Sequence, residues 1–143
     1  MVTYRKSGLG QFGFYLGTCC PQLSMFAAPF KKRLLNLCSG TGSVSVPFRE
    51  NGWDVVEVDW GDRFGPTHVV DITTWDYTVY DHFDVIWCSP DCTQYSRART
   101  RAKTPRNVEK ADELVRACLR IIEHFRPMCW FVENPDSGLL KTR

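Results

Sequence analysis

The sequence has no long apolar run, no internal repeat and little net charge. Its 143 residues carry 18 Lys and Arg against 16 Asp and Glu, a formal net charge of +2. That charge is too small for the whole-molecule field to indicate a nucleic-acid partner, so such a signal must come from local clustering. With 43% hydrophobic and 13% aromatic residues, the chain is neither disordered nor collagen-like, and its length fits one domain.

The lack of a continuous apolar stretch excludes a membrane span and a secretory signal. The uncharged segment 7–30 holds no apolar run longer than residues 25–28, far short of the ~20 residues that a span needs. We interpret residues 1–29 as an N-terminal extension, and we expect a soluble, intracellular protein that is not secreted. Residues 8–13 match a Gly-x-Gly-x-x-Gly fingerprint, but no strand pattern precedes them, so we give the match no meaning.

The cysteines show neither a disulfide pattern nor a metal-site pattern. There are seven, an odd and scattered set that indicates a reducing compartment. Cys38, Cys88, Cys118 and Cys129 occupy apolar positions, where cysteine behaves as a small hydrophobe. Cys88 and Cys92 have no second pair of ligands nearby in the sequence, so we expect no metal site.

From residue 31 onward, short apolar runs alternate with helical stretches, which predicts an α/β domain over residues 30–143 with a mostly parallel sheet and helices on both faces. A helix is expected over 43–51. A longer one is expected over 105–125, with Thr104 as N-cap, Pro105 at the first helical position and a stop at residues 126–127. The five expected strands are 34–38, 55–59, 68–70, 83–88 and 128–133.

Function in such a sheet lies at the carboxyl ends of the strands. The first strand leads into a glycine turn, and Asp59 lies 17 positions after Gly42, close to the spacing at which an acidic residue reaches ribose hydroxyls. Trp60 is suited to cover an adenine face, and Asp71 to accept from its amine. No Lys follows Gly42 to hold a phosphate. The pattern favours S-adenosylmethionine, although either carboxylate alone has a plainer interpretation as a cap or turn residue.

The fourth and fifth strands lead into Ser89-Pro90-Asp91-Cys92 and Glu133-Asn134-Pro135. Three motifs resemble those of the DNA cytosine-5 methyltransferases, especially the compact phage and viral versions. Gly40-x-Gly42 resembles their cofactor loop, Pro90-x-Cys92 their nucleophile motif, and Glu133-Asn134 their Glu-Asn motif. The resemblance covers about residues 33–135 and implies a Rossmann-like methyltransferase fold. The cofactor-binding residues that we expect are Cys38, Ser39, Gly40, Thr41, Gly42, Asp59, Trp60, Asp71, Ile72 and Pro90.

The resemblance implies a reaction as well as a fold. Cys92 would add to C6 of a flipped cytosine, and Glu133 would hold the edge of the ring while C5 takes a methyl group from S-adenosylmethionine. Asn134 and Pro135 would shape the turn that presents Glu133. The implied partner is DNA, with tRNA as the alternative substrate.

Basic residues cluster directly after Cys92. Five cations fall within residues 97–106, and no acidic residue stands between Cys92 and Glu109. A loop that meets a phosphate backbone requires such a cluster, although a solvated basic loop is the plainer alternative. The residues expected to contact the substrate are Ser96, Arg97, Arg99, Arg101, Asn134 and Pro135.

The sequence departs from the family pattern in two ways. Asp91 precedes the expected nucleophile where the family usually has Pro, and a carboxylate there opposes thiolate formation unless it is paired elsewhere. The chain ends ten residues after Glu133, so the later strands and a target-recognition region are not found. We therefore also consider one half of a split enzyme with a second chain, a catalytically silent binding module and, ranked last, an amino-group methyltransferase in which residues 89–92 are a damaged motif.

Overall fold

The computed structural model describes residues 2–3, 31–97, 99, 102–135 and 138–142. Apart from Val2 and Thr3, the expected extension 1–29 lies outside these residues, and so do its glycine match at 8–13 and Arg101. Within the described residues, no helix has the length and apolar character needed to cross a membrane.

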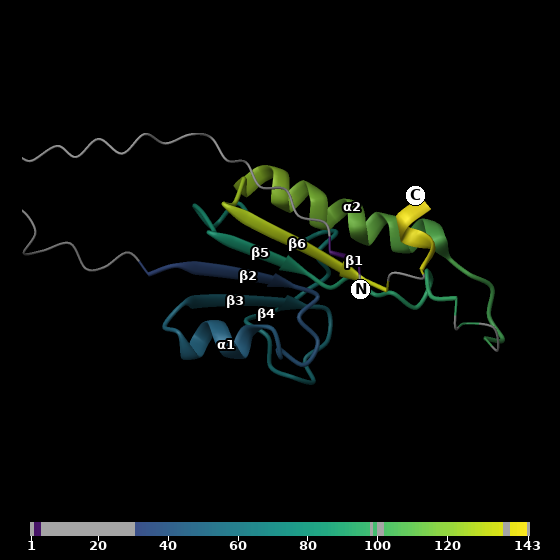
Figure 1. The fold of residues 1–143 in the computed structure, drawn as a ribbon, viewed down its shortest axis with the longest axis horizontal. Helices are drawn as coiled ribbons and strands as arrows, with labels where there is room; N and C mark the ends of the chain where they lie inside the picture. Colours follow the sequence, from purple (N-terminus) through teal and green to yellow (C-terminus); the bar gives the residue numbers. More distant parts are fainter. Residues whose placement is uncertain (1, 4–30, 98, 100–101, 136–137, 143) are drawn as a thin grey trace, which may run out of the picture.

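Apolar runs from distant parts of the chain form one sheet (Figure 1), with the strand order β1-β6-β5-β2-β3-β4. All neighbouring strands are parallel except β1, which pairs antiparallel with the end of β6. The strands are β1 (Val2–Thr3), β2 (Arg33–Leu37), β3 (Asp54–Asp59), β4 (His68–Val69), β5 (Val85–Cys88) and β6 (Cys129–Asn134).

Helices α1 (Ser45–Glu50) and α2 (Val108–Phe125) cover opposite faces of the sheet. Side chains alternate along β2, so Leu35 and Leu37 belong to the core that also holds Ile121 of α2. Asn36 points to the other face, where its Nδ2 donates to Ser45 Oγ of α1 at 3.0 Å. Burying a side chain such as that of Ile121 stabilises the fold by about 1.5–3 kcal/mol, so the core between α2 and the sheet contributes to the stability of the fold.

The five expected strands are confirmed, with ends that shift by one or two residues. Cys38 is not part of β2, because its φ of 55° turns the chain away from the extended conformation. Residues 83–84 precede β5 rather than forming its start. The strand β1 was not expected, since a pair of residues is too short to show a pattern.

The long helix is confirmed, but its expected start is wrong. It begins at Val108, and Asn107 is the cap, because the Asn107 side chain accepts from the backbone N–H of Lys110. The Thr104 hydroxyl, which we expected to cap the helix, accepts instead from Arg99. At its other end the helix stops at Arg126 as expected, with φ 46° at that residue.

Candidate active site

The carboxyl ends of β2, β3, β5 and β6 meet at one edge of the sheet (Figure 1), because these strands are parallel and adjacent. Asp59 ends β3, the Glu133-Asn134 pair ends β6, and the loops after β2 and β5 carry the glycine turn and Cys92. The edge therefore brings together four of the segments in which sequence patterns predicted function.

The glycine turn is tight and open to an approaching ligand. The N–H of Gly42 donates to Ser39 O at 2.9 Å, and Ser45 N–H donates to Gly42 O at 2.9 Å. Gly40 has a φ of 52° with nothing within 4 Å of where a Cβ would stand. Glycine at that position leaves the backbone free to touch a bound molecule.

Asp59 holds the glycine turn against the end of β3. Its Oδ2 accepts from Gly40 N–H at 2.8 Å, and its Oδ1 accepts from Gly61 N–H at 3.0 Å. Each carboxylate oxygen retains a further lone pair, so these bonds do not prevent a contact to ligand hydroxyls. Asp59 therefore fixes the shape of the turn whether or not it also meets a ligand. Trp60 follows it with 84% of its surface exposed.

Asp71 forms a turn with Thr73, whose N–H and hydroxyl both donate to Asp71 Oδ1 at 2.9 and 2.8 Å. These hydrogen bonds, that of the backbone N–H first, lower the pKa of Asp71 below its usual value. The carboxylate is exposed, and Ile72 beside it is buried. Asp71 is thus a turn residue, and both bonds from Thr73 go to its Oδ1 atom.

Three thiols meet beneath the glycine turn. Cys38 hydrogen-bonds Cys118 of α2, which also contacts Cys88 at the end of β5. The hydrogen bond to Cys118, together with burial, raises the pKa of the Cys38 thiol far above its usual range. Because this thiol points toward the core, the backbone of Cys38 and not its side chain is available to contact a cofactor. The structure places Cys88 and Cys118 in the core, as expected for small hydrophobes.

Cys92 begins a single helical turn. Its carbonyl accepts from the N–H groups of Tyr95 at 3.0 Å and Ser96 at 2.9 Å. Asp91 caps this turn, because its Oδ1 accepts from Thr93 N–H and its Oδ2 from the Thr93 hydroxyl. The Asp91 carboxylate, the departure noted above, is thus engaged with Thr93. Cys92 itself is half-buried.

The turn of Cys92 is joined to the end of β6. Asn134 is buried, and its Nδ2 donates to Pro90 O at 3.2 Å. Beyond β6, the N–H of Leu139 donates to Tyr95 O at 3.0 Å. These two bonds bring the turn of Cys92 beside Asn134 and Leu139, with half-buried Glu133 directly before Asn134.

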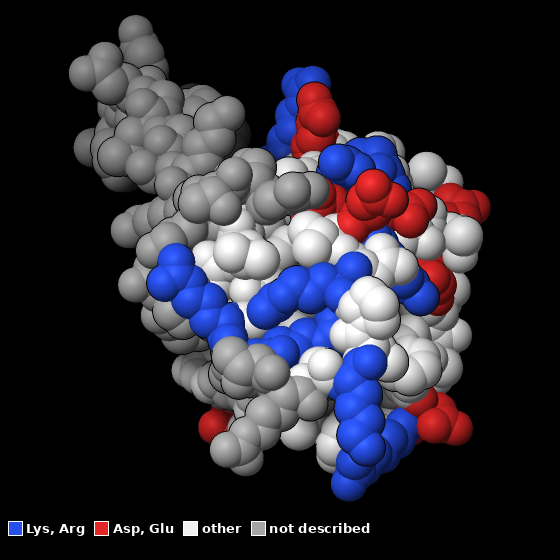
Figure 2. Space-filling view, turned by 90° about the vertical axis from the view of Figure 1, so that its right-hand side faces the viewer, with Lys and Arg blue, Asp and Glu red and all other residues white. Residues whose placement is uncertain are grey.

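The basic segment after Cys92 lies at the same edge. Figure 2 shows Lys and Arg side chains across the middle of the face where the strands end, with acidic ones toward its margin. Arg97 and Lys103 are exposed. Arg99 is instead turned onto its own segment, because its guanidinium donates to Gln94 and Thr104. The guanidinium of Arg99 is therefore engaged within the segment, whereas the side chains of Arg97 and Lys103 face solvent.

Two pairs of side chains in this region had no place in the sequence interpretation. Tyr95 is fully buried, and its hydroxyl donates to the buried Asp112 of α2 at 2.8 Å. Glu57 is buried behind the glycine turn, where Arg49 donates to it at 2.7 Å. A charged residue within the apolar run of β3 was a signal for this ion pair, whereas nothing in the pattern signalled the pair of Tyr95 and Asp112.

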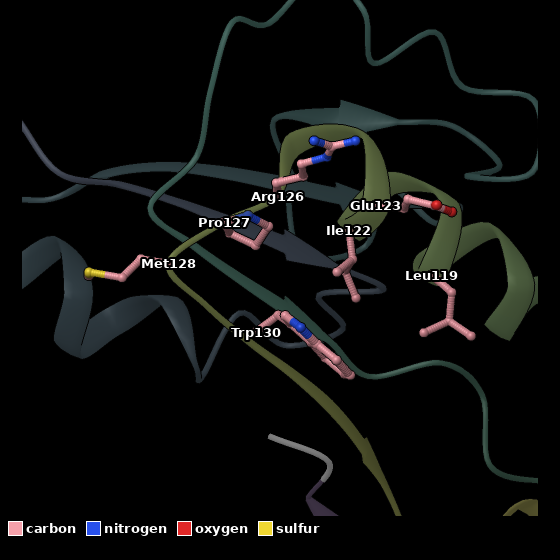
Figure 3. Close-up of a pocket in the computed structure, with 7 residues that line it drawn as sticks. All are labelled: Leu119, Ile122, Glu123, Arg126, Pro127, Met128 and Trp130. Carbon is pink, nitrogen blue, oxygen red and sulfur yellow. The ribbon is translucent and has the colours of Figure 1, made fainter. Parts of the chain in front are cut away.

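One pocket lies away from this edge, between the last turns of α2 and the start of β6 (Figure 3). Leu119, Ile122, Met128 and Trp130 contribute its apolar walls. It contains no residue of the candidate site. Among the described residues, no group of three or more His, Cys, Asp or Glu is arranged to hold a metal ion.

Comparisons with known proteins place the chain in a family. Residues 33–143 match the model of the family described as C-5 cytosine-specific DNA methylase. A protein of Frog virus 3 (isolate Goorha), named probable DNA (cytosine-5)-methyltransferase, is 36% identical over 123 residues, which cover 76% of this chain and 56% of that protein.

Among solved structures, the sugar N-methyltransferase KedS8 from Streptoalloteichus sp ATCC 53650 is 20% identical, with a TM-score of 0.39 over 64% of this chain and 37% of its own. This likeness is too distant to bear on the site. The chain spans just over half the length of its viral relative. Because the family model covers residues 33–143, most of the chain, this protein belongs to the C-5 cytosine-specific DNA methylases.

Proposed function

We propose that residues 30–143 form a methyltransferase domain that transfers a methyl group from S-adenosylmethionine to C5 of cytosine in DNA. The observation that carries the proposal is the junction between the Cys92 turn and the end of β6, made by the bond from Asn134 to Pro90 O. The junction supports a nucleophile and an acid that act on one base. Membership of the family supports DNA as the substrate.

The glycine turn and its neighbours fit an adenosine group. Open space at Gly40 allows a ligand to approach the backbone, and the exposed ring of Trp60 offers a stacking surface. Asp59 would offer lone pairs to ribose hydroxyls, and Asp71 would accept from the adenine amine. Ser39, Thr41 and Pro90 complete the proposed cofactor site. When bound, S-adenosylmethionine supplies an electrophilic methyl group.

Cys92 and Glu133 would perform the chemistry on the base. The Cys92 thiolate adds to C6 of cytosine, and the electron pair that moves to C5 makes that carbon nucleophilic. Glu133 holds N3 and the exocyclic amine, which favours the protonated ring as Cys92 attacks. After C5 is methylated, the proton on C5 is removed to a base, the double bond re-forms and the Cys92 sulfur leaves.

A base inside a duplex cannot reach Cys92, so the target must be flipped out at a cost of a few kcal/mol. Exposed cations beside Cys92, such as Arg97, would hold the phosphates that flank the flipped base. We extend this role to Ser96 and Arg101, which lie near Arg97 in the sequence, and to Pro135 on the other side of the junction.

Trapping the covalent step tests the proposal. The chain is incubated with S-adenosylmethionine and an oligonucleotide that contains 5-fluorocytosine, whose fluorine blocks the last step. We expect a denaturant-resistant adduct that Cys92→Ser abolishes and Glu133→Gln reduces. Cys129→Ser is the matched control, because this half-buried cysteine begins β6, at the end of the strand opposite to the site. No adduct with the unmodified chain on DNA would contradict the proposal.

A second candidate follows from the length of the match, which covers 56% of the viral relative. The chain would then be a module that binds cofactor and DNA but methylates only with a second chain, or not at all. Calorimetry and the adduct assay together separate the candidates. Both candidates bind S-adenosylmethionine, but the module forms no adduct alone. A parallel assay with tRNA distinguishes the two nucleic acids as substrates.

A further inference from the structure

We propose that Gln94 is a positioning residue for the reaction, because its side chain ties the basic segment of residues 97–106 to the turn of Cys92. We call Gln94, Arg99, Arg106 and Asn107 the Gln94 clasp. The inference rests on the proposed function, and it assigns Arg99 to the clasp instead of to DNA.

The side chain of Gln94 fixes two distant points of the segment with one atom. Its Oε1 accepts from the guanidinium of Arg99 and, at 2.9 Å, from the backbone N–H of Asn107. Asn107 is also the cap of α2. The same carbonyl oxygen therefore links the middle of the basic segment to the start of the helix that packs on the sheet.

Arg106 closes the segment from its other end. Its Nη1 donates to Gln94 O at 2.6 Å, and its Nη2 donates to Ser96 O at 2.9 Å. Both acceptors lie within the helical turn that starts at Cys92, whose carbonyl accepts from Ser96 N–H. Arg106 thus holds the turn of the proposed nucleophile directly, through main-chain oxygens that any side chain at those positions would present.

The clasp divides the cations into two classes. The Nη2 atom of Arg99 also donates to Thr104 Oγ1 at 2.6 Å and to Thr104 O at 3.2 Å. A DNA phosphate would have to displace these bonds, and those of Arg106, to gain either guanidinium. Arg97 and Lys103 are exposed and form no ion pair or hydrogen bond among the described residues, so they are available to a phosphate.

A clasp of this kind fixes the nucleophile before DNA arrives. Without it, the segment between Gln94 and Asn107 would be a flexible loop, and the Cys92 turn would sample positions away from the flipped base. Misplacing a reacting group by about 1 Å can cost about a hundredfold in rate. Loss of the clasp should therefore lower the rate of the chemical step more than the affinity for DNA.

The test compares Gln94→Ala with Gln94→Glu. The Gln94 side chain takes part in the clasp through its Oε1 acceptor, so glutamate keeps that acceptor and alanine removes it, while both keep the main-chain oxygen that accepts from Arg106. With 5-fluorocytosine DNA at saturation, we expect Gln94→Ala to form the adduct roughly 10- to 100-fold more slowly, while the DNA dissociation constant changes by less than about threefold. Gln94→Glu should restore the rate. Arg99→Ala should behave like Gln94→Ala.

Arg97→Ala should give the opposite pattern, because its DNA dissociation constant should rise by a larger factor than its adduct rate at saturation falls. Arg120→Ala, at an exposed position on α2, controls for the loss of one positive charge and should change neither quantity. The inference is wrong if Gln94→Ala keeps the unmodified rate, if it weakens DNA binding as much as it slows the adduct, or if Gln94→Glu fails to rescue it.

Amide hydrogen exchange tests the clasp independently of catalysis. Gln94→Ala should speed exchange at the amide of Asn107, which donates to Gln94, and leave the amides of β2 unchanged. If the unmodified chain forms no adduct, the proposed function fails, and equal exchange at Asn107 in both proteins would overturn the clasp itself.

Discussion

Glu57 is a charged residue within an apolar strand, and it restricts which residue can occupy position 42. A Cβ at Gly42 would stand 2.7 Å from Glu57 Oε1, and Gly42 has a φ of 71°. Because Arg49 holds the Glu57 carboxylate in an ion pair, the carboxylate cannot simply move aside. This ion pair, in which Glu57 is buried and Arg49 is exposed, thus shapes the glycine turn from one side, while Asp59 holds the turn through Gly40.

This arrangement predicts different costs for two similar substitutions. Gly40→Ala meets open space and bears only the cost of a left-handed backbone, about 1–2 kcal/mol. Gly42→Ala adds the collision with Glu57, so its free energy of unfolding should fall further. Chemical denaturation of both variants measures the difference. Equal losses would mean that Glu57 gives way freely.

The thiols near the site predict a pattern of alkylation. The hydrogen bond to Cys118 and burial raise the pKa of Cys38. Against an opposing contact with Cys38, the contact with Cys88 and burial raise the pKa of Cys118, so thiolate is scarce at either residue near pH 8. We expect iodoacetamide to modify Cys92 in the native protein and to modify Cys38 and Cys118 only after denaturation. Peptide mass spectrometry reads each site separately. Rapid native labelling of Cys118 would contradict the packing described.

At the scale of elements, the sequence predicted the strands better than the segments between them. Apolar runs between turn residues indicate a buried strand wherever they occur, so β2, β3, β5 and β6 were expected. The glycine turn, which we propose for the cofactor, and the two motifs lie at the ends of these strands.

The start of α2 could not be predicted in the same way. Thr104-Pro105 and Asn107 are both good helix starts by residue type. The choice between them depends on Arg99 and Gln94, which occupy Thr104 and the N–H of Asn107. Such contacts are set by how the segment folds back, and no periodicity records them. The pair of Tyr95 and Asp112 was missed for the same reason.

That pair predicts a measurable link between the Cys92 turn and α2. Tyr95→Phe removes the hydroxyl that donates to buried Asp112, so the free energy of unfolding should fall by about 1–3 kcal/mol. Tyr77→Phe is the matched control, because it keeps the ring that packs against Phe125 and His124. Urea denaturation compares the two variants. A larger loss from Tyr77→Phe would contradict the importance of the buried bond.

At the scale of the whole molecule, the exposed cations predict how DNA binding responds to salt. Each phosphate contact contributes about 0.9 to the slope of log K against log salt. Arg97→Ala and Lys103→Ala should each lower the slope by about that amount, whereas Arg120→Ala should not. Fluorescence anisotropy over a range of salt concentrations measures the slope. An unchanged slope in both loop variants would place the DNA elsewhere.

Acid should weaken the fold through its short turns. The pKa values of Asp71 and Asp76 are lowered by hydrogen bonds from Thr73 and Thr78. Since these values lie below those of the unfolded chain, the stabilisation is present above about pH 4 and is lost as the pH falls through the folded values. Melting temperatures from neutral to acid pH test this, and replacing both residues with Asn should flatten the decline. A decline just as steep in that variant would assign it to other groups.

The pairing of β1 with β6 has a consequence for the order of folding. It joins Val2 to Asn134 and Thr3 to Glu133, the longest separation along the chain of any strand pair in the sheet. Closing so large a loop costs conformational entropy, and the pairing of just two residues of β1 offsets that cost. We therefore expect β1 to be added last, onto a sheet already assembled, and to detach first when the protein opens, which uncovers the backbone of Glu133 before the core loosens.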